Sequence, residues 1–247
     1  KREGITTPYV PPEFKDLPVQ QGNVYLRDAD WHFVGAEVFV IGFAYNPKTL
    51  PKEQAPRTWD DLLDPKWKGQ IQMPNPAASG TATLSVLAQI MQVIRAGRTE
   101  KEAWEFWEKL NKNVSLYPES GAAPTRAVAK GDAKIGICFS FMPWGLAARG
   151  ESVDFILPAQ TPVIANPVAL VKGSKRPENG KRLYDFILGV KGQQILADYS
   201  QIVLNKKVKP TTPLSFEQVS RNAMPLDVDW AQANYDRIRN EWRGRFG

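Results

Sequence analysis

The chain has 247 residues, 43% of them hydrophobic and 23% charged, a composition that excludes extended disorder and suits one large domain or two smaller ones. The formal net charge is +6, but basic and acidic side chains are interleaved, as in 172–182 and 237–245, which disfavours nucleic-acid binding. No apolar run reaches the roughly 18 residues of a membrane-spanning helix, so we expect a soluble protein.

The amino-terminal half alternates predicted strands and helices after a proline-rich, irregular segment at 8–30. Thr58 and Thr99 are the expected N-caps of two of these helices. Trp104 and Trp107 recur at helical spacing and indicate a buried face. The predicted elements are strands at 37–45 and 70–73 and helices at 60–63, 82–94 and 100–111.

The carboxyl-terminal half continues the alternation, which favours an α/β architecture with mainly parallel sheets. Cys138 lies in an apolar run and is expected to be a small buried hydrophobe. Trp230 and Trp242 are expected to be core residues of the last helix. The predicted elements are strands at 114–116, 133–141, 153–158 and 168–171, and helices at 123–130, 142–150, 177–192, 193–199 and 227–246.

Ser79-Gly80-Thr81 stands where a predicted strand and turn give way to a helix. One interpretation is a plain N-cap, because Ser and Thr side chains satisfy the free amides of a helix start. The other is an anion site, because a glycine admits a ligand to those amides and the helix dipole favours negative charge. Ser120-Gly121 repeats the pattern, so two junctions that face each other would form one cleft.

The residues needed for several kinds of catalysis are absent from the sequence. His32 is the single histidine and no G-x-S-x-G elbow occurs, which argues against a hydrolase triad. One histidine and one cysteine far apart argue against a zinc site, and no dinucleotide-binding or triphosphate-binding glycine loop appears. Asp60 and Asp61 fit a helix start better than a catalytic pair. We therefore expect no enzyme, no cofactor and no metal.

The segment TWDDLLDPKWKGQIQMPNPAASGTA, residues 58–82, resembles the signature of the extracellular solute-binding proteins of ABC transporters. The branch is the one that includes ferric-iron, phosphonate and sugar-phosphate binders. AVAKGDAKIGI, residues 127–137, and the segments at 168–198 and 227–242 resemble further parts of the same family pattern. The resemblance runs from about Asp30 to the end of the chain.

The resemblance implies an α/β, two-lobed periplasmic-binding-protein fold, type II like, whose lobes close on a ligand. It implies lobe one at 1–43 and 157–205 and lobe two at 44–156 and 206–247. Lobe one is expected to be incomplete at its amino end, since the family carries further residues before the equivalent of Lys1. The expected result is an exposed apolar patch containing Val38, Val40, Val168, Leu170 and 183–188.

The resemblance also implies which residues contact the solute. Ferric-binding members carry two adjacent tyrosines where this chain has Phe141-Met142-Pro143-Trp144, so an organic phosphate or phosphonate is the favoured ligand. A ferric-iron protein that uses an exogenous anion and Tyr45, Tyr117 or His32 is the alternative. The expected ligand-binding residues are Ser79, Gly80, Thr81, Ser120, Gly121, Ala122, Trp31, Met142 and Trp144.

The function implied by the resemblance is delivery of a small anionic solute to an ABC transporter permease in the inner membrane. The expected location is the periplasm, reached with an export signal, or a lipid-anchored position outside a Gram-positive cell. The complete protein is expected to be a monomer that binds no nucleic acid. Another alternative is an enzyme on a similar two-lobed scaffold, which would be recognised by its turnover of a substrate.

Overall fold

The computed structural model describes residues 3–247. The expectation that lobe one is incomplete at its amino end concerns Lys1 and so lies outside the described residues. The chain divides into two compact units. The first unit comprises the residues up to Phe39 together with Val163–Ala223, and the second comprises Val40–Pro162 with Met224–Gly247. The assignment of lobes at 1–43 with 157–205 and 44–156 with 206–247 stays a prediction.

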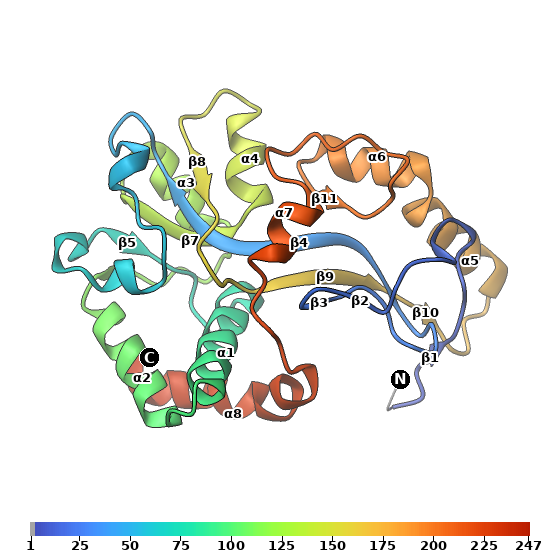
Figure 1. The fold of residues 1–247 in the computed structure, drawn as a ribbon, viewed down its shortest axis with the longest axis horizontal. Helices are drawn as coiled ribbons and strands as arrows, with labels where there is room; N and C mark the ends of the chain where they lie inside the picture. Colours follow the sequence, from blue (N-terminus) through green and yellow to red (C-terminus); the bar gives the residue numbers. More distant parts are fainter. Residues whose placement is uncertain (1–2) are drawn as a thin grey trace. The chain divides into compact units, whose positions relative to one another are not determined.

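The second unit is built on a mixed sheet (Figure 1). β5 runs parallel to both β6 and β7, whereas β4 is antiparallel to β7 and β8. The expectation of mainly parallel sheets was therefore wrong, because only the strands joined through helices run parallel here. The strands are β4 (Val34–Tyr45), β5 (Ile71–Gln72), β6 (Val114–Leu116), β7 (Ile135–Phe139) and β8 (Asp154–Ile156).

Aromatic side chains of its helices form much of the core of the second unit. α1 packs against α2 and α8, and α3 packs against β7 (Figure 1). Trp107 and Trp242 lie edge to face with ring centroids 5.6 Å apart, so these tryptophans are core residues, as predicted. The helices are α1 (Gly80–Arg95), α2 (Glu100–Asn111), α3 (Ala123–Lys130), α4 (Phe141–Ala147) and α8 (Val228–Phe246), with short 3₁₀ turns η2 (Lys52–Gln54), η3 (Asp60–Leu63) and η4 (Pro65–Trp67).

The first unit contains short strands around the other half of β4. β11 pairs antiparallel with β4 so that Ile202 faces Val38, and β9 pairs with β4 as well. Val38 and Val40 are buried, which corrects their placement in the exposed apolar patch. The elements are β1 (Thr6–Thr7), β2 (Gln20–Gln21), β3 (Val24–Tyr25), β9 (Val163–Val168), β10 (Leu170–Val171), β11 (Ile202–Val203), η1 (Pro12–Phe14), α5 (Pro177–Leu188), α6 (Val190–Asp198) and α7 (Phe216–Arg221).

Two boundaries in this unit differ from the predicted ones. The strand expected at 168–171 is two strands, β9 and β10. β9 begins earlier than expected because its residues pair with β4. The sequence Asn166-Pro167 within β9 is typical of a turn, so the local pattern did not predict a strand there. The helices expected at 177–192 and 193–199 divide at Gly189. Gly192 does not end a helix. A Cβ on it would clash with the Phe186 carbonyl oxygen, so this glycine lets α6 approach α5 closely.

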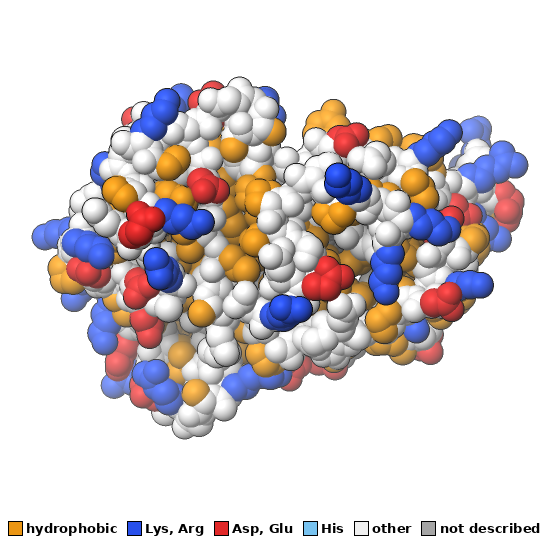
Figure 2. Space-filling view, turned by 45° about the horizontal axis from the view of Figure 1, so that its top comes forward, with side chains coloured by type: hydrophobic (Ala, Val, Ile, Leu, Met, Phe, Trp, Pro, Cys, Tyr) orange, Lys and Arg blue, Asp and Glu red, His pale blue; other side chains and the backbone are white. Residues whose placement is uncertain are grey.

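Two further expectations concern burial and surface. Cys138 is fully buried, and burial raises the pKa of its thiol to about 12, which confirms the apolar role predicted for it. Figure 2 shows lysine and arginine scattered among aspartate and glutamate on the visible face. Within residues 3–247, none of the helices combines the length and apolar character needed to span a membrane.

Candidate functional site

Three helix starts follow the carboxyl ends of three neighbouring parallel strands in the second unit. β5 leads to α1, β6 leads to α3, and β7 leads to α4. Because the carboxyl ends of parallel strands meet at one edge of a sheet, the three helix starts gather there. This is the arrangement expected for the two Ser-Gly junctions, with α4 as a third participant.

Backbone bonds hold the first two junctions together. The Asn75 N–H donates to the Pro118 carbonyl at 2.8 Å, joining the segment before α1 to the segment before α3. The Asn75 carbonyl accepts from the Ser79 N–H at 2.8 Å, which sets the approach of the chain to α1. From α8, Arg239 donates to the Ala77 carbonyl in the same turn. Asn75 and Arg239 are positioning residues that the sequence interpretation missed.

The space above Gly121 is where the predicted residues converge. A Cβ built on Gly121 would lie 3.2 Å from Thr81 Oγ1, 3.3 Å from Ser79 Oγ and 3.8 Å from Met142 Cε. Ser79 is 8% exposed and Thr81 is 6% exposed, so both hydroxyls belong to largely buried side chains. The structure therefore brings together Ser79, Thr81, Gly121 and Met142.

The Ser79 hydroxyl does not cap α1. Ser79 occupies the N-cap position with extended backbone, but its side chain makes no capping hydrogen bond. The first amides of α1 thus stay available, as the first amides of a helix do when no side chain caps them. Thr83 Oγ1 donates to the Pro76 and Ser79 carbonyls, so a different hydroxyl stabilises this turn. The geometry leaves two hydroxyls and the helix amides as hydrogen-bond donors to a bound anion.

The remaining residues of these junctions lie nearby with more local roles. Gly80 is exposed and a Cβ on it would meet nothing within 4 Å, so the backbone at the start of α1 is open. The Ala122 N–H donates to Ser120 Oγ at 3.4 Å, and Ser120 itself is exposed. Ser120 and Ala122 thus shape the loop that presents Gly121.

The two tryptophans proposed from the resemblance have other packing partners. Trp144 is buried and its ring lies edge to face against Phe155, with centroids 5.4 Å apart. Trp31 belongs to the first unit, where the Arg27 guanidinium lies 3.9 Å from its ring centroid. A ligand contact by either tryptophan stays a prediction, and the burial of Trp144 does not favour it.

The residues of the ferric-iron alternative are each engaged elsewhere. The Tyr45 hydroxyl donates to Asp154 at 3.0 Å, and burial, with the Asp154 carboxylate, raises the pKa of Tyr45 to about 12. The Tyr117 hydroxyl donates to Asn111 at 2.9 Å, and burial raises its pKa. His32 Nδ1 is hydrogen-bonded to Thr6 Oγ1 at 2.7 Å. Raised tyrosine pKa values oppose the deprotonation that iron coordination requires.

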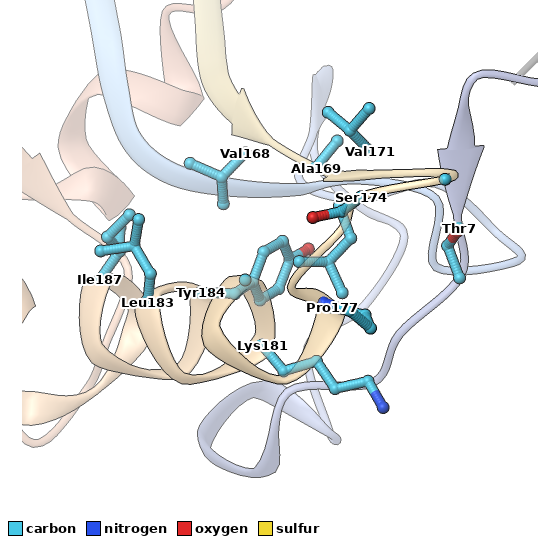
Figure 3. Close-up of a pocket in the computed structure, with 13 residues that line it drawn as sticks. Thr7, Val168, Ala169, Val171, Ser174, Pro177, Lys181, Leu183, Tyr184 and Ile187 are labelled. Carbon is cyan, nitrogen blue, oxygen red and sulfur yellow. The ribbon is translucent and has the colours of Figure 1, made fainter.

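The first unit contains an apolar pocket of about 490 Å³ (Figure 3). Leu183, Tyr184 and Ile187 of α5 form one wall and Val168 lies opposite them. The lining is mainly hydrocarbon, in contrast to the hydroxyl pair of the second unit. This pocket suits apolar packing rather than an anion.

Comparison with known proteins supplies a family for this geometry. A family model described as bacterial extracellular solute-binding protein matches residues 1–234. An uncharacterized protein of Haemophilus influenzae is 33% identical over 186 residues, which are 72% of this chain and 52% of that protein. A Salmonella typhi protein with the name putative 2-aminoethylphosphonate-binding periplasmic protein is 29% identical over 168 residues, 65% of this chain and 48% of that protein.

A solved structure is similar over nearly all of this chain. The periplasmic binding protein AfuA from Actinobacillus pleuropneumoniae, with exogenous fructose-6-phosphate bound, matches with a TM-score of 0.78 and 27% identity. The match covers 98% of this chain and 76% of that one. The α/β periplasmic-binding-protein fold expected from the sequence is thereby confirmed. The chain spans about half the length of the curated relatives it matches.

Proposed function

Because the chain belongs to the bacterial extracellular solute-binding proteins, we propose that it binds a small organic phosphate or phosphonate for import by an ABC transporter. The anionic group is held at the space above Gly121 by the hydroxyls of Ser79 and Thr81 and by the first amides of α1. Met142 contacts the organic part of the solute.

The observation that carries this proposal is the missing cap at Ser79. A serine at an N-cap position usually accepts a hydrogen bond from an amide one turn into the helix. Here the largely buried Ser79 hydroxyl makes no such bond and lies beside the Thr81 hydroxyl at the glycine of the next junction. Two donors held ready in this way stabilise a bound anion, since hydrogen bonds to charged groups contribute about 1.5–3 kcal/mol each.

The relatives support the class of solute. One is named for 2-aminoethylphosphonate, and the solved structure holds fructose-6-phosphate. Both compounds present a tetrahedral phosphorus oxyanion on a polar organic body. We propose the same oxyanion chemistry for this chain, with a role in transport rather than catalysis, a periplasmic or lipid-anchored location and a membrane permease as partner.

The test is a calorimetric titration of the chain with 2-aminoethylphosphonate and with fructose-6-phosphate. Ser79→Ala combined with Thr81→Val is expected to weaken binding at least tenfold, on the order of 1.4 kcal/mol, because two donors to the anion are lost. Stability should change by less than the ~1 kcal/mol typical of a lost helix cap, because Ser79 makes no cap bond.

The control is Ser85→Ala in the same helix. The Ser85 hydroxyl donates to the Thr81 carbonyl at 3.0 Å and is fully buried, so it supports the helix and its loss should leave affinity unchanged. Equal affinity of the double variant and the parent chain, with the fold intact, would mean that the anion is held elsewhere.

A further inference from the structure

Met142 is the one methionine of the chain that is not buried. The chain has four methionines and one cysteine, all of them within residues 3–247. Met73, Met91 and Met224 are buried, with 0%, 3% and 1% of their surface exposed, whereas Met142 in α4 is partly exposed. Cys138 is fully buried, and burial raises the pKa of its thiol, which suppresses the reactive thiolate. An oxidant in solution therefore reaches the Met142 side chain before the other sulfur-containing side chains.

The Met142 side chain lies between a buried apolar cluster and the proposed anion site. One side of it packs against the cluster that contains Cys138. Its terminal methyl carbon, Cε, is 3.8 Å from the position that a Cβ on Gly121 would take. The same position is 3.2 Å from Thr81 Oγ1 and 3.3 Å from Ser79 Oγ. Because the sulfur is bonded to this methyl carbon, an atom added to the sulfur comes close to the two hydroxyls.

Oxidation by a peroxide changes the chemistry of such a side chain. The sulfur lone pair attacks one oxygen of hydrogen peroxide, the O–O bond breaks, an S–O bond forms, and the other oxygen leaves as water. The sulfur gives two electrons to the peroxide, and the thioether becomes a sulfoxide. A thioether is apolar and only a weak acceptor, whereas the sulfoxide is polar and its oxygen accepts hydrogen bonds.

We propose that Met142 is a modification site, at which oxidation to the sulfoxide switches off anion binding. The proposal rests on the proposed function, because it takes the hydroxyls of Ser79 and Thr81 as donors to the anion. The sulfoxide oxygen accepts hydrogen bonds from these hydroxyls and occupies space beside Gly121, so it competes with the oxygens of a phosphate or phosphonate. Reduction of the sulfoxide returns the thioether and with it the site.

The first measurement is mass spectrometry of peptides from the full chain after graded exposure to hydrogen peroxide. Met142 is expected to gain one oxygen atom before Met73, Met91 and Met224 do, and all four should react alike in the urea-unfolded chain. Added 2-aminoethylphosphonate should slow the reaction at Met142, because a bound solute covers its methyl group. Oxidation of one of the three buried methionines ahead of Met142 would overturn the proposal.

The second measurement is calorimetric titration with 2-aminoethylphosphonate and with fructose-6-phosphate before and after peroxide treatment. The oxidised parent chain is expected to bind at least roughly tenfold more weakly, on the order of 1.4 kcal/mol. Treatment with both methionine sulfoxide reductases should restore the affinity. Met142→Leu forms no sulfoxide, so its affinity, whatever the starting value, should be the same before and after peroxide. Met91→Leu, at a buried position of α1, is the matched control and should keep the response of the parent chain.

The outcomes separate this proposal from the proposed function. An untreated parent chain that binds neither solute would contradict the proposed function and the switch together. Binding that survives full oxidation of Met142 would overturn the switch alone, and so would a peroxide-induced loss that Met142→Leu shares. Circular dichroism after oxidation should show an intact fold, since a loss of binding caused by unfolding would also overturn the switch.

Discussion

Gly121 marks the space that the proposed anion occupies. A methyl group there would lie 3.2 Å from Thr81 Oγ1 and 3.3 Å from Ser79 Oγ, so it would occupy the position between the two hydroxyls. These neighbours are side-chain atoms that yield by a few tenths of an ångström. Gly121→Ala is therefore expected to fold normally and to bind organophosphate at least tenfold more weakly, on the order of 1.4 kcal/mol, as measured by calorimetry.

The matched control for this substitution is Gly145→Ala in α4. A Cβ on Gly145 meets nothing within 4 Å, and alanine is favoured over glycine within a helix. This variant should keep parental affinity and show equal or greater stability. An undiminished affinity of Gly121→Ala would show that the ligand lies away from the hydroxyl pair.

Some site residues were predictable from the sequence and others were not. Ser79, Thr81 and Gly121 stand in short strand-turn-helix patterns, and parallel strands bring such junctions to one edge. Arg239 is distant in sequence from the turn before α1, and only the docking of α8 brings its guanidinium to the Ala77 carbonyl. Local patterns predict local groups, whereas a contact made by tertiary packing has no local signal.

At the scale of elements, β4 and β9 hold a buried carboxyl group between them. Glu37 of β4 is buried and accepts a hydrogen bond from Asn166 Nδ2 at 2.7 Å. Burial raises the pKa of Glu37 above its ordinary value of 4.5, and the Asn166 bond opposes this only in part. The folded chain therefore holds this proton to higher pH than the unfolded chain does.

Glu37→Gln tests the consequence for stability. With a raised native pKa, the contribution of Glu37 is fully present below pH 4.5 and is lost as the pH rises through the native value. Glutamine keeps the acceptor for Asn166 without the charge. Urea unfolding should show similar stability of the two chains at about pH 4 and a more stable variant at about pH 7. A variant that is less stable near neutral pH would contradict this account.

Element boundaries were predictable where local signals and packing agree. α2 has the predicted limits because Thr99 and Glu102 form a capping box at its start. The division between α5 and α6 was misplaced because Gly192 serves close packing instead of helix termination. β9 was missed because its pairing with β4 is a long-range contact, and Asn166-Pro167 resembles a turn locally.

At the scale of the whole chain, α5 and α6 carry exposed apolar side chains. Leu183 and Phe186 of α5 and Ile195 of α6 are exposed, and so is Tyr199 just beyond α6. Part of the predicted apolar patch is therefore present, although Val38, Val40, Tyr184 and Leu188 are buried. Phe186 and Ile195 line the same shallow hollow, and neighbouring exposed apolar side chains favour association, because contact removes them from water.

We expect the 247-residue chain to self-associate through this face as its concentration rises, which sedimentation velocity measures. Phe186→Lys combined with Ile195→Lys should shift the distribution toward monomer, because burying two charges in the contact is unfavourable. Ile94→Lys with Leu116→Lys is the matched control, since these apolar side chains are exposed in the second unit and should not alter association. A chain that stays monomeric at every concentration and binds organophosphate at micromolar concentration or tighter would contradict the prediction, because the exposed face would then have no cost for solubility or function.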